Sequence, residues 1–425
     1  MNYSTQTTKN GVVIQNIFSN NFKSDTVSLQ FFTSLTKQNA ANIALLCAVL
    51  KRGNARLGEM DKINTFLEKN YGASFSVATS KAGEMQELAL TVRFLDDRFA
   101  IDGENVSQNM VSLLYATLFE PLLENGGFKA SFVNQEKQNL KDKIASLIND
   151  KRAYSLEMCK RAMFENESYG IYEQGSIEEI DKITPCSLFE FFKNLIKNSM
   201  LFISYAGFER DTSALFTPIL NKLDVSPRPV LKTQINNLVG DIKYVTEQMD
   251  VAQSKLNIGL RLGDGALNNP FAFKMFNVIF GSCPTSKLFM NVREKMSLCY
   301  YCASAADAIK NVMFIYSGIE TADYQKALNE ILHQLELMKS GDISSEEFDN
   351  ARAYLIDAYI QTADSLDATI SLCTSSRISG HSLTPEDQIE RIKAVTLEDV
   401  ITVAKDIKVD TVYLLKGVGG EESAD

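Results

Sequence analysis

Apolar and polar positions alternate at two places early in the chain, TVSLQFF at 26–32 and ELALTVRF at 87–94. A period of two is typical of strands with one buried face, so both runs predict strands. Residues 42–50, NIALLCAVL, are apolar on every side and predict a buried helix that ends at Gly53. Further helical patterns cover about 108–118 and 130–164, the second as one long segment.

The same order of patterns returns in the second half of the chain. Its predicted strands cover 255–262 and 311–317, and its predicted helices cover 270–280, 324–338 and 345–362. Two local matches lie at nearly the same offset: 177–184 resembles 389–396, and the FVN at 132 resembles the FDN at 348. These observations predict a duplicated α+β domain.

A proline-containing stretch separates the two halves. Residues 224–240 include Pro227 and Pro229, and proline resists both helices and central strands, so we expect an extended connector there. The predicted domains are therefore 1–223 and 241–425, joined by a linker at 224–240.

Composition narrows the class of protein. The chain has 425 residues, a net charge of −10 and seven cysteines. The acidic balance argues against binding to nucleic acid or to an anionic membrane surface. Neither a signal-peptide pattern nor an apolar run of roughly 20 residues is present, which predicts a cytoplasmic protein with reduced cysteines.

The stretch 286–301, SKLFMNVREKMSLCYY, carries the strongest candidate for binding chemistry. It predicts an amphipathic helix followed by a strand, and it brings Arg293 and Tyr300 to one junction. A guanidinium and a phenol suit the carbonyls of an extended peptide or a carboxylate. The alternative is that Arg293 pairs with a local acid and Tyr300 only packs. The predicted buried stripe of the helix is Leu288, Phe289, Val292 and Met296.

The segment VREKMSLCY resembles the second-domain motif of the insulinase/pitrilysin-type zinc peptidases, the group that includes the mitochondrial processing peptidases. The chain departs from that motif at Lys287, where the family has Arg, and at Ser297, where it has Gly. The resemblance implies that Arg293 and Tyr300 bind the substrate backbone. It also implies two homologous domains of the processing-peptidase/LuxS-like metallohydrolase fold, each an antiparallel sheet with helices packed on one face.

The resemblance also locates a zinc site in the first domain, where the family carries H-x-x-E-H before a basic-Gly turn. In this chain Ala44, Cys47 and Ala48 occupy the two histidine positions and the glutamate position, and Lys143 takes the place of the third ligand. Ala offers no lone pair, and Lys places a cation where a cation should bind. The resemblance therefore implies a degenerate metal site, with zinc expected only in a partner subunit.

Other metal or catalytic motifs are weak. The two histidines, His333 and His381, have no His or Cys at ligand spacing. Cys299 and Cys302 are three apart on a predicted strand, so we expect them to point to opposite faces and not to share a metal. We also find no G-x-S-x-G motif and no phosphate-binding loop.

Three functions remain open. The first is a non-catalytic, substrate-binding subunit of a heterodimeric zinc peptidase, with a peptide substrate and an H-x-x-E-H-bearing homologous subunit as partners. The second is a structural or peptide-binding scaffold with no hydrolytic role. The third is a free-standing hydrolase with a site of its own, and we rank it last.

Overall fold

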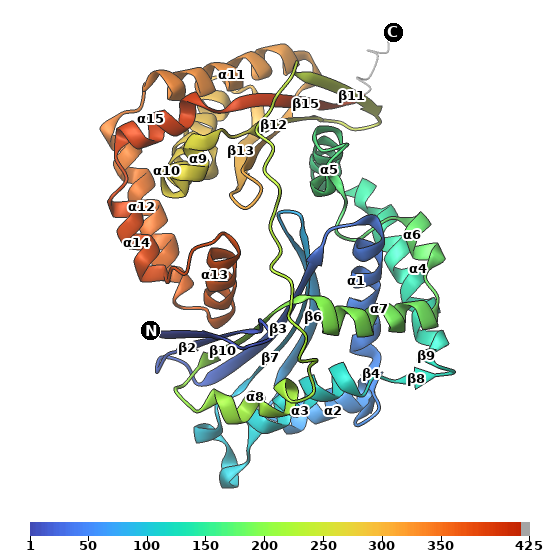
Figure 1. The fold of residues 1–425 in the computed structure, drawn as a ribbon. Coiled ribbons are helices and arrows are strands. Elements are labelled where there is room, and N and C mark those ends of the chain that lie inside the picture. Colours follow the sequence, from blue (N-terminus) through green and yellow to red (C-terminus); the bar gives the residue numbers. More distant parts are fainter. Residues whose placement is uncertain (418–425) are drawn as a thin grey trace. The chain divides into compact units, whose positions relative to one another are not determined.

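The computed structural model describes residues 1–417, and these divide into two compact units (Figure 1). Unit 1 comprises Met1–Ala145, Ile171–Thr233 and Thr362–Thr384. Unit 2 comprises Ser146–Gly170, Gln234–Gln361 and the residues from Pro385 onward. The chain passes between them after Thr233, inside the stretch predicted as the linker. Two segments are exchanged: 146–170, from the first half of the chain, belongs to unit 2, and 362–384, from the second half, belongs to unit 1. The sequence did not predict this exchange.

Unit 1 is built on a six-stranded sheet with the order β1-β2-β10-β3-β7-β6. Its strands are β1 (Asn2–Thr7), β2 (Val13–Phe18), β3 (Ser24–Ser34), β6 (Ser74–Ala82), β7 (Met85–Leu95) and β10 (Met200–Gly207). All neighbours are antiparallel except β10 and β2, which are parallel. The predicted alternation is confirmed, because Leu29 and Phe31 lie in the hydrophobic core while Gln30 faces the other side of the sheet.

Helices cover both faces of this sheet, whereas the sequence predicted helices on one face. The unit contains α1 (Lys37–Val49), α2 (Met60–Lys69), α3 (Val106–Phe119), α4 (Ala130–Ser146), α6 (Ile177–Lys182), α7 (Pro185–Asn198), α8 (Thr212–Leu220) and the exchanged α13 (Leu366–Ile378). Its short turns and ribbons are η1 (Leu50–Arg52), β4 (Gly53–Asn54), β5 (Gly58–Glu59), η2 (Asp97–Phe99), η3 (Ile101–Gly103), β8 (Leu123–Glu124) and β9 (Gly127–Phe128). On α13, Thr374 donates to Gln30 and accepts from Gln15, so this helix covers the polar face.

Unit 2 repeats the strand arrangement with five strands in the order β11-β15-β12-β14-β13. They are β11 (Lys243–Met249), β12 (Ser254–Arg261), β13 (Cys299–Asp307), β14 (Val312–Ile319) and β15 (Lys408–Gly417). This order matches β2-β10-β3-β7-β6 position by position, and the one parallel pair, β11 with β15, falls at the same place. The duplicated α+β domain is therefore confirmed, with one parallel pair in each otherwise antiparallel sheet.

The helices of unit 2 also include an exchanged one. The unit contains α5 (Lys151–Met163), α9 (Asp264–Asn268), α10 (Pro270–Asn277), α11 (Tyr324–Ser340), α12 (Ser345–Thr362), α14 (Pro385–Lys393), α15 (Leu397–Lys405), the π-helices η6 (Val278–Ser282) and η7 (Leu288–Lys295), and the short turns η4 (Leu147–Asn149), η5 (Ser168–Gly170) and η8 (Thr321–Asp323). The helix predicted at 130–164 is broken, because α5 starts anew with Asp150 as its N-cap. Helix α5 packs on β12, where Gly259 leaves room for Met163; a Cβ there would lie 2.4 Å from the Met163 sulfur.

Buried charges fix the exchanged segment 146–170 to unit 2. The Glu167 carboxylate lies 2.7 Å from the Arg261 guanidinium and 2.6 Å from the ammonium of Lys310, whose side chain is fully buried. Asp410 pairs with the other side of Arg261 at 2.7 Å. Within residues 1–417, no helix is long and apolar enough to cross a membrane.

Candidate functional site

The junction predicted to hold Arg293 and Tyr300 lies where η7 leads into β13. Helix η7 is a π-helix, and in it Leu288 and Val292 are fully buried while Met296, just beyond its end, is 46% exposed. The predicted stripe was therefore wrong at Met296, because the wider π turn and the end of the helix at Lys295 carry that position out of the α-helical register.

A left-handed residue turns the chain from the helix into the strand. Ser297 has φ = 52°, a conformation that costs any residue with a Cβ and that glycine adopts freely. Its N–H donates to the Arg293 carbonyl at 3.1 Å, and the Leu298 N–H donates to the Val292 carbonyl at 3.0 Å. The tight turn that follows places β13, and with it Tyr300, beside the last turn of η7.

Arg293 and Tyr300 line one pocket of about 430 Å³ within unit 2, so the structure brings the two predicted residues together. The other lining residues are Glu294, Ser297, Leu298, Cys299 and Glu320. The Arg293 guanidinium lies over the Phe289 ring at 4.5 Å and 3.4 Å from the Glu294 carboxylate, and its side chain is 38% exposed. The Arg293 side chain is therefore partly open to solvent.

The sequence did not indicate Glu320, which directly follows β14. The Tyr300 hydroxyl donates to the Glu320 carboxylate at 2.5 Å, and this hydrogen bond raises the pKa of Tyr300. The pocket thus presents a cation, a phenol and a carboxylate. Together they can donate to peptide carbonyls and accept from a peptide N–H. No local signal in the sequence pairs Glu320 with Tyr300, because β13 and β14 meet only through the sheet.

The positions predicted as a degenerate metal site lie together in unit 1. Ala44, Cys47 and Ala48 lie on α1, which is buried along most of its length as predicted. Burial raises the pKa of Cys47 to about 12, against the opposing charges of Lys51 and Lys143. Lys143, on α4, is close enough to act on this thiol, and its ammonium donates to Gln174 at 3.2 Å.

These side chains do not fit a zinc ion. The two alanines carry no donor atom, the Cys47 thiol stays protonated, and Lys143 contributes a positive charge. Glu136, on α4, is held in an ion pair with Arg52 at 2.5 Å. Among the described residues, no group of three His, Cys, Asp or Glu side chains is close enough to hold a metal ion.

The prediction for Cys299 and Cys302 was wrong about their geometry. The register of β13 against β14 shifts between Cys299 and Tyr301, so that Cys299 pairs with Ile319 and Cys302 with Ser317. Ser317 and Ile319 are two apart on β14 and therefore share a face of the sheet. Their partners Cys299 and Cys302 lie opposite them, so the two thiols also face the same side. A β-bulge of this kind leaves no clear trace in the local sequence.

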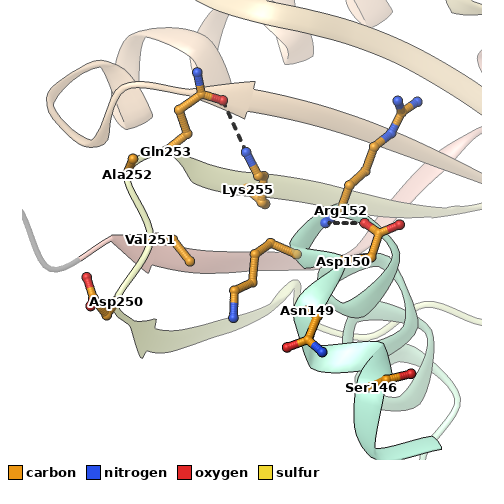
Figure 2. A pocket seen from close by; sticks show the side chains of 10 residues that line it. Ser146, Asn149, Asp150, Arg152, Asp250, Val251, Ala252, Gln253 and Lys255 are labelled. Carbon is orange, nitrogen blue, oxygen red and sulfur yellow. Dashed lines mark hydrogen bonds between the residues drawn. The ribbon is translucent and has the colours of Figure 1, made fainter. Parts of the chain in front are cut away.

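Unit 2 has a second, larger pocket of about 930 Å³ between the start of α5 and the loop that joins β11 to β12 (Figure 2). It combines Lys151, Arg152 and Lys255 with Asp150 and Asp250. Asp150 already caps the N-terminus of α5, and the Arg152 guanidinium lies over the rings of Tyr301 and Tyr316 at 4.6 and 4.7 Å. Asp150 and Arg152 are thus engaged within the chain, and the pocket gives no sharp indication of a ligand.

Comparison with known proteins identifies relatives along nearly the whole chain. Residues 182–355, which include Arg293 and Tyr300, match the family described as Peptidase M16 inactive domain. Over 402 residues the chain is 30% identical to the probable inactive metalloprotease YmfF of Bacillus subtilis, covering 94% of both proteins. An uncharacterized zinc protease of Streptomyces coelicolor is 22% identical over 293 residues, covering 65% of this chain and 62% of that protein.

Solved structures show the same fold. A conserved protein from Enterococcus faecalis superposes with a TM-score of 0.88 at 27% identity, covering 98% of this chain and 99% of the other. A peptidase M16 inactive domain from Pseudomonas fluorescens superposes with a TM-score of 0.81 at 16% identity, with the same coverage. The second similarity concerns the fold alone.

Proposed function

The chain belongs to the peptidase M16 family, the insulinase/pitrilysin-type peptidases, and on this basis we propose that it is a non-catalytic, peptide-binding subunit. Its partner would be a homologous subunit that carries H-x-x-E-H and the zinc. The proposed division of labour leaves this chain to hold an extended peptide while the partner cleaves it.

The observation that carries the proposal is the shared pocket of Arg293 and Tyr300. The Arg293 fork is partly exposed and offers several N–H donors to a peptide carbonyl or terminal carboxylate. Glu320 can accept a hydrogen bond from the peptide backbone, and the Tyr300 hydroxyl can give up its bond to Glu320 for a carbonyl. A chain with a purely structural role has no need of such exposed, convergent polar groups.

The absence of catalysis is supported by the donor set in unit 1. Ala44 and Ala48 cannot bind zinc, and the ammonium of Lys143 opposes it. The Bacillus relative is described as a probable inactive metalloprotease, and the matched family model as an inactive domain. We also propose a cytoplasmic location, which is supported by the seven cysteines all being free thiols.

The test is a peptidase assay of the reconstituted complex. The chain is co-expressed with an H-x-x-E-H homologue, and the Arg293→Ala/Tyr300→Phe variant is compared with the native chain. Charge-assisted hydrogen bonds contribute about 1.5–3 kcal/mol, so kcat/KM should fall roughly ten- to hundredfold. The matched control is Arg391→Ala/Tyr354→Phe, at exposed positions outside the pocket, which should leave the rate unchanged.

Two results would overturn the proposal. Unchanged activity in the pocket variant would remove the assigned role of Arg293 and Tyr300. A chain that forms stable assemblies but never associates with a zinc-bearing homologue would instead favour the scaffold function.

A further inference from the structure

The two cysteines at the start of β13 form a pair that the proposed function does not use. The register shift at Tyr300 places Cys299 and Cys302 on the same face of the sheet, and each thiol shifts the pKa of the other. An unbulged strand would hold these two side chains on opposite faces. The bulge thus brings two thiols to one side of the strand.

The surroundings of the pair favour a thiolate on Cys299. The neighbouring Cys302 thiol and the nearby charge of Arg293 lower the pKa of Cys299, against the effect of burial. The Cys299 thiol and burial raise the pKa of Cys302.

The two thiols differ in their access to solvent. Cys299 lines the pocket of Arg293 and Tyr300 and is 9% exposed, so part of this residue faces the pocket. Cys302 is not among the residues that line this pocket, and it is 2% exposed. A cysteine in a pocket wall with a more deeply buried cysteine next to it is the arrangement of an attacking cysteine and its resolving cysteine.

The remaining explanation, a metal site, lacks a third ligand. The described residues place no additional His, Cys, Asp or Glu side chain with the pair to complete a group of three. We propose that Cys299 and Cys302 form a redox-responsive dithiol, in which a peroxide entering the pocket oxidises Cys299 and Cys302 closes the disulfide.

The reaction needs only a hydroperoxide as its oxidant. The Cys299 thiolate attacks one peroxide oxygen, the O–O bond breaks and hydroxide leaves, so that a sulfenic acid forms on Cys299. Cys302 then attacks that sulfur, the S–O bond breaks, and the departing hydroxide takes up the thiol proton as water. Overall the two sulfurs lose two electrons, and the peroxide is reduced to one water and one hydroxide, which takes a proton from the solvent.

The strand can accommodate the crosslink. Among the described strands, β13 lies at the edge of its sheet and pairs only with β14. It can therefore shorten at the bulge without breaking a second ladder of hydrogen bonds. An i to i+3 disulfide in a central strand would disturb both neighbours.

The experiment uses the folded full chain with Cys186→Ser, a change that removes an exposed competing thiol. This chain is treated with one equivalent of hydrogen peroxide. Mass spectrometry after alkylation and proteolysis should find the peptide around 299–302 short of two hydrogens, and denatured thiol titration should show the loss of two thiols. In Cys302→Ser, the sulfenic acid should persist on Cys299 and be trapped by dimedone. Circular dichroism before digestion confirms that the chain is still folded.

The control is Cys283→Ser, which removes another buried cysteine of unit 2 and should leave the crosslink intact. The proposal is wrong if the native pair stays reduced while other cysteines oxidise, or if dimedone labels Cys302 in place of Cys299. If the cysteine variants misfold, the peptide mass of the otherwise native chain still decides. None of these readouts depends on peptide binding, so they test the dithiol separately from the proposed function.

Discussion

Ser297 provides a prediction that follows directly from backbone geometry. Its φ of 52° lies in the left-handed region, at the turn where related peptidases are expected to carry glycine. A left-handed residue with a Cβ costs about 1–2 kcal/mol, and Ser297→Gly removes that cost. The new glycine gives the unfolded chain more freedom, which returns about 0.4–1 kcal/mol. The net expectation is a stabilisation of roughly 0.5–1 kcal/mol.

The assay is equilibrium unfolding in urea, followed by circular dichroism, with thermal unfolding as a second reading. For a unit of about 200 residues, a stabilisation of this size corresponds to a rise of about 1–4 °C in Tm. Peptide binding should be unaffected, because the substitution removes only a hydroxymethyl group at the pocket rim.

The matched control reverses the change at a comparable turn. Gly72 has φ = 70° and nothing within 4 Å of an added Cβ, so Gly72→Ser should destabilise the chain by about 1 kcal/mol through backbone strain alone. If Ser297→Gly is neutral or destabilising while Gly72→Ser behaves as expected, the reasoning about strain at this junction is refuted.

Two further predictions concern buried charges. Burial raises the pKa of Asp25 to about 6 from its ordinary 3.8 despite the nearby Arg210. Between these two pH values the folded chain binds a proton that the unfolded chain has lost, so the contribution of Asp25 to the free energy of unfolding falls by about 1 kcal/mol from pH 5 to 7. In urea unfolding, the Asp25→Asn variant should lack this fall. A pH dependence equal to that of the native chain would contradict the prediction. Glu167→Gln should destabilise unit 2 by about 3 kcal/mol, because it leaves the fully buried Lys310 ammonium without its carboxylate. A change under 1 kcal/mol in the same assay would show that Glu167 does not anchor the exchanged segment 146–170.

Short-range patterns predicted the elements of this fold well. The alternation at 26–32 and 87–94 identified β3 and β7, and the apolar run at 42–50 identified most of α1, because each depends on burial along a single element. Periodicity could not show which sheet a helix covers, so the exchange of α5 and α13 was not predicted.

In the candidate site, too, residues close together in the sequence were predicted, and residues that meet only through the sheet were not. Arg293 and Tyr300 share a short stretch of sequence, and the helix–strand pattern was sufficient to place them near one another. Glu320 lies on the other side of a strand pair, and only the register of that pair brings it to Tyr300. Cys299 and Cys302 share a face of the sheet because of a single bulge. Without it, the strand period would place one of the two side chains on the opposite face.

The claim that any peptide cleavage is carried out by a partner is tested most directly by the zinc content of the isolated chain. The purified chain is dialysed against buffer with trace zinc and analysed by mass spectrometry of the metal, with an H-x-x-E-H homologue measured in parallel. The account predicts about one zinc per homologue and far less than one per molecule of this chain. About one tightly held zinc per molecule of this chain, together with peptidase activity that chelation abolishes, would contradict it.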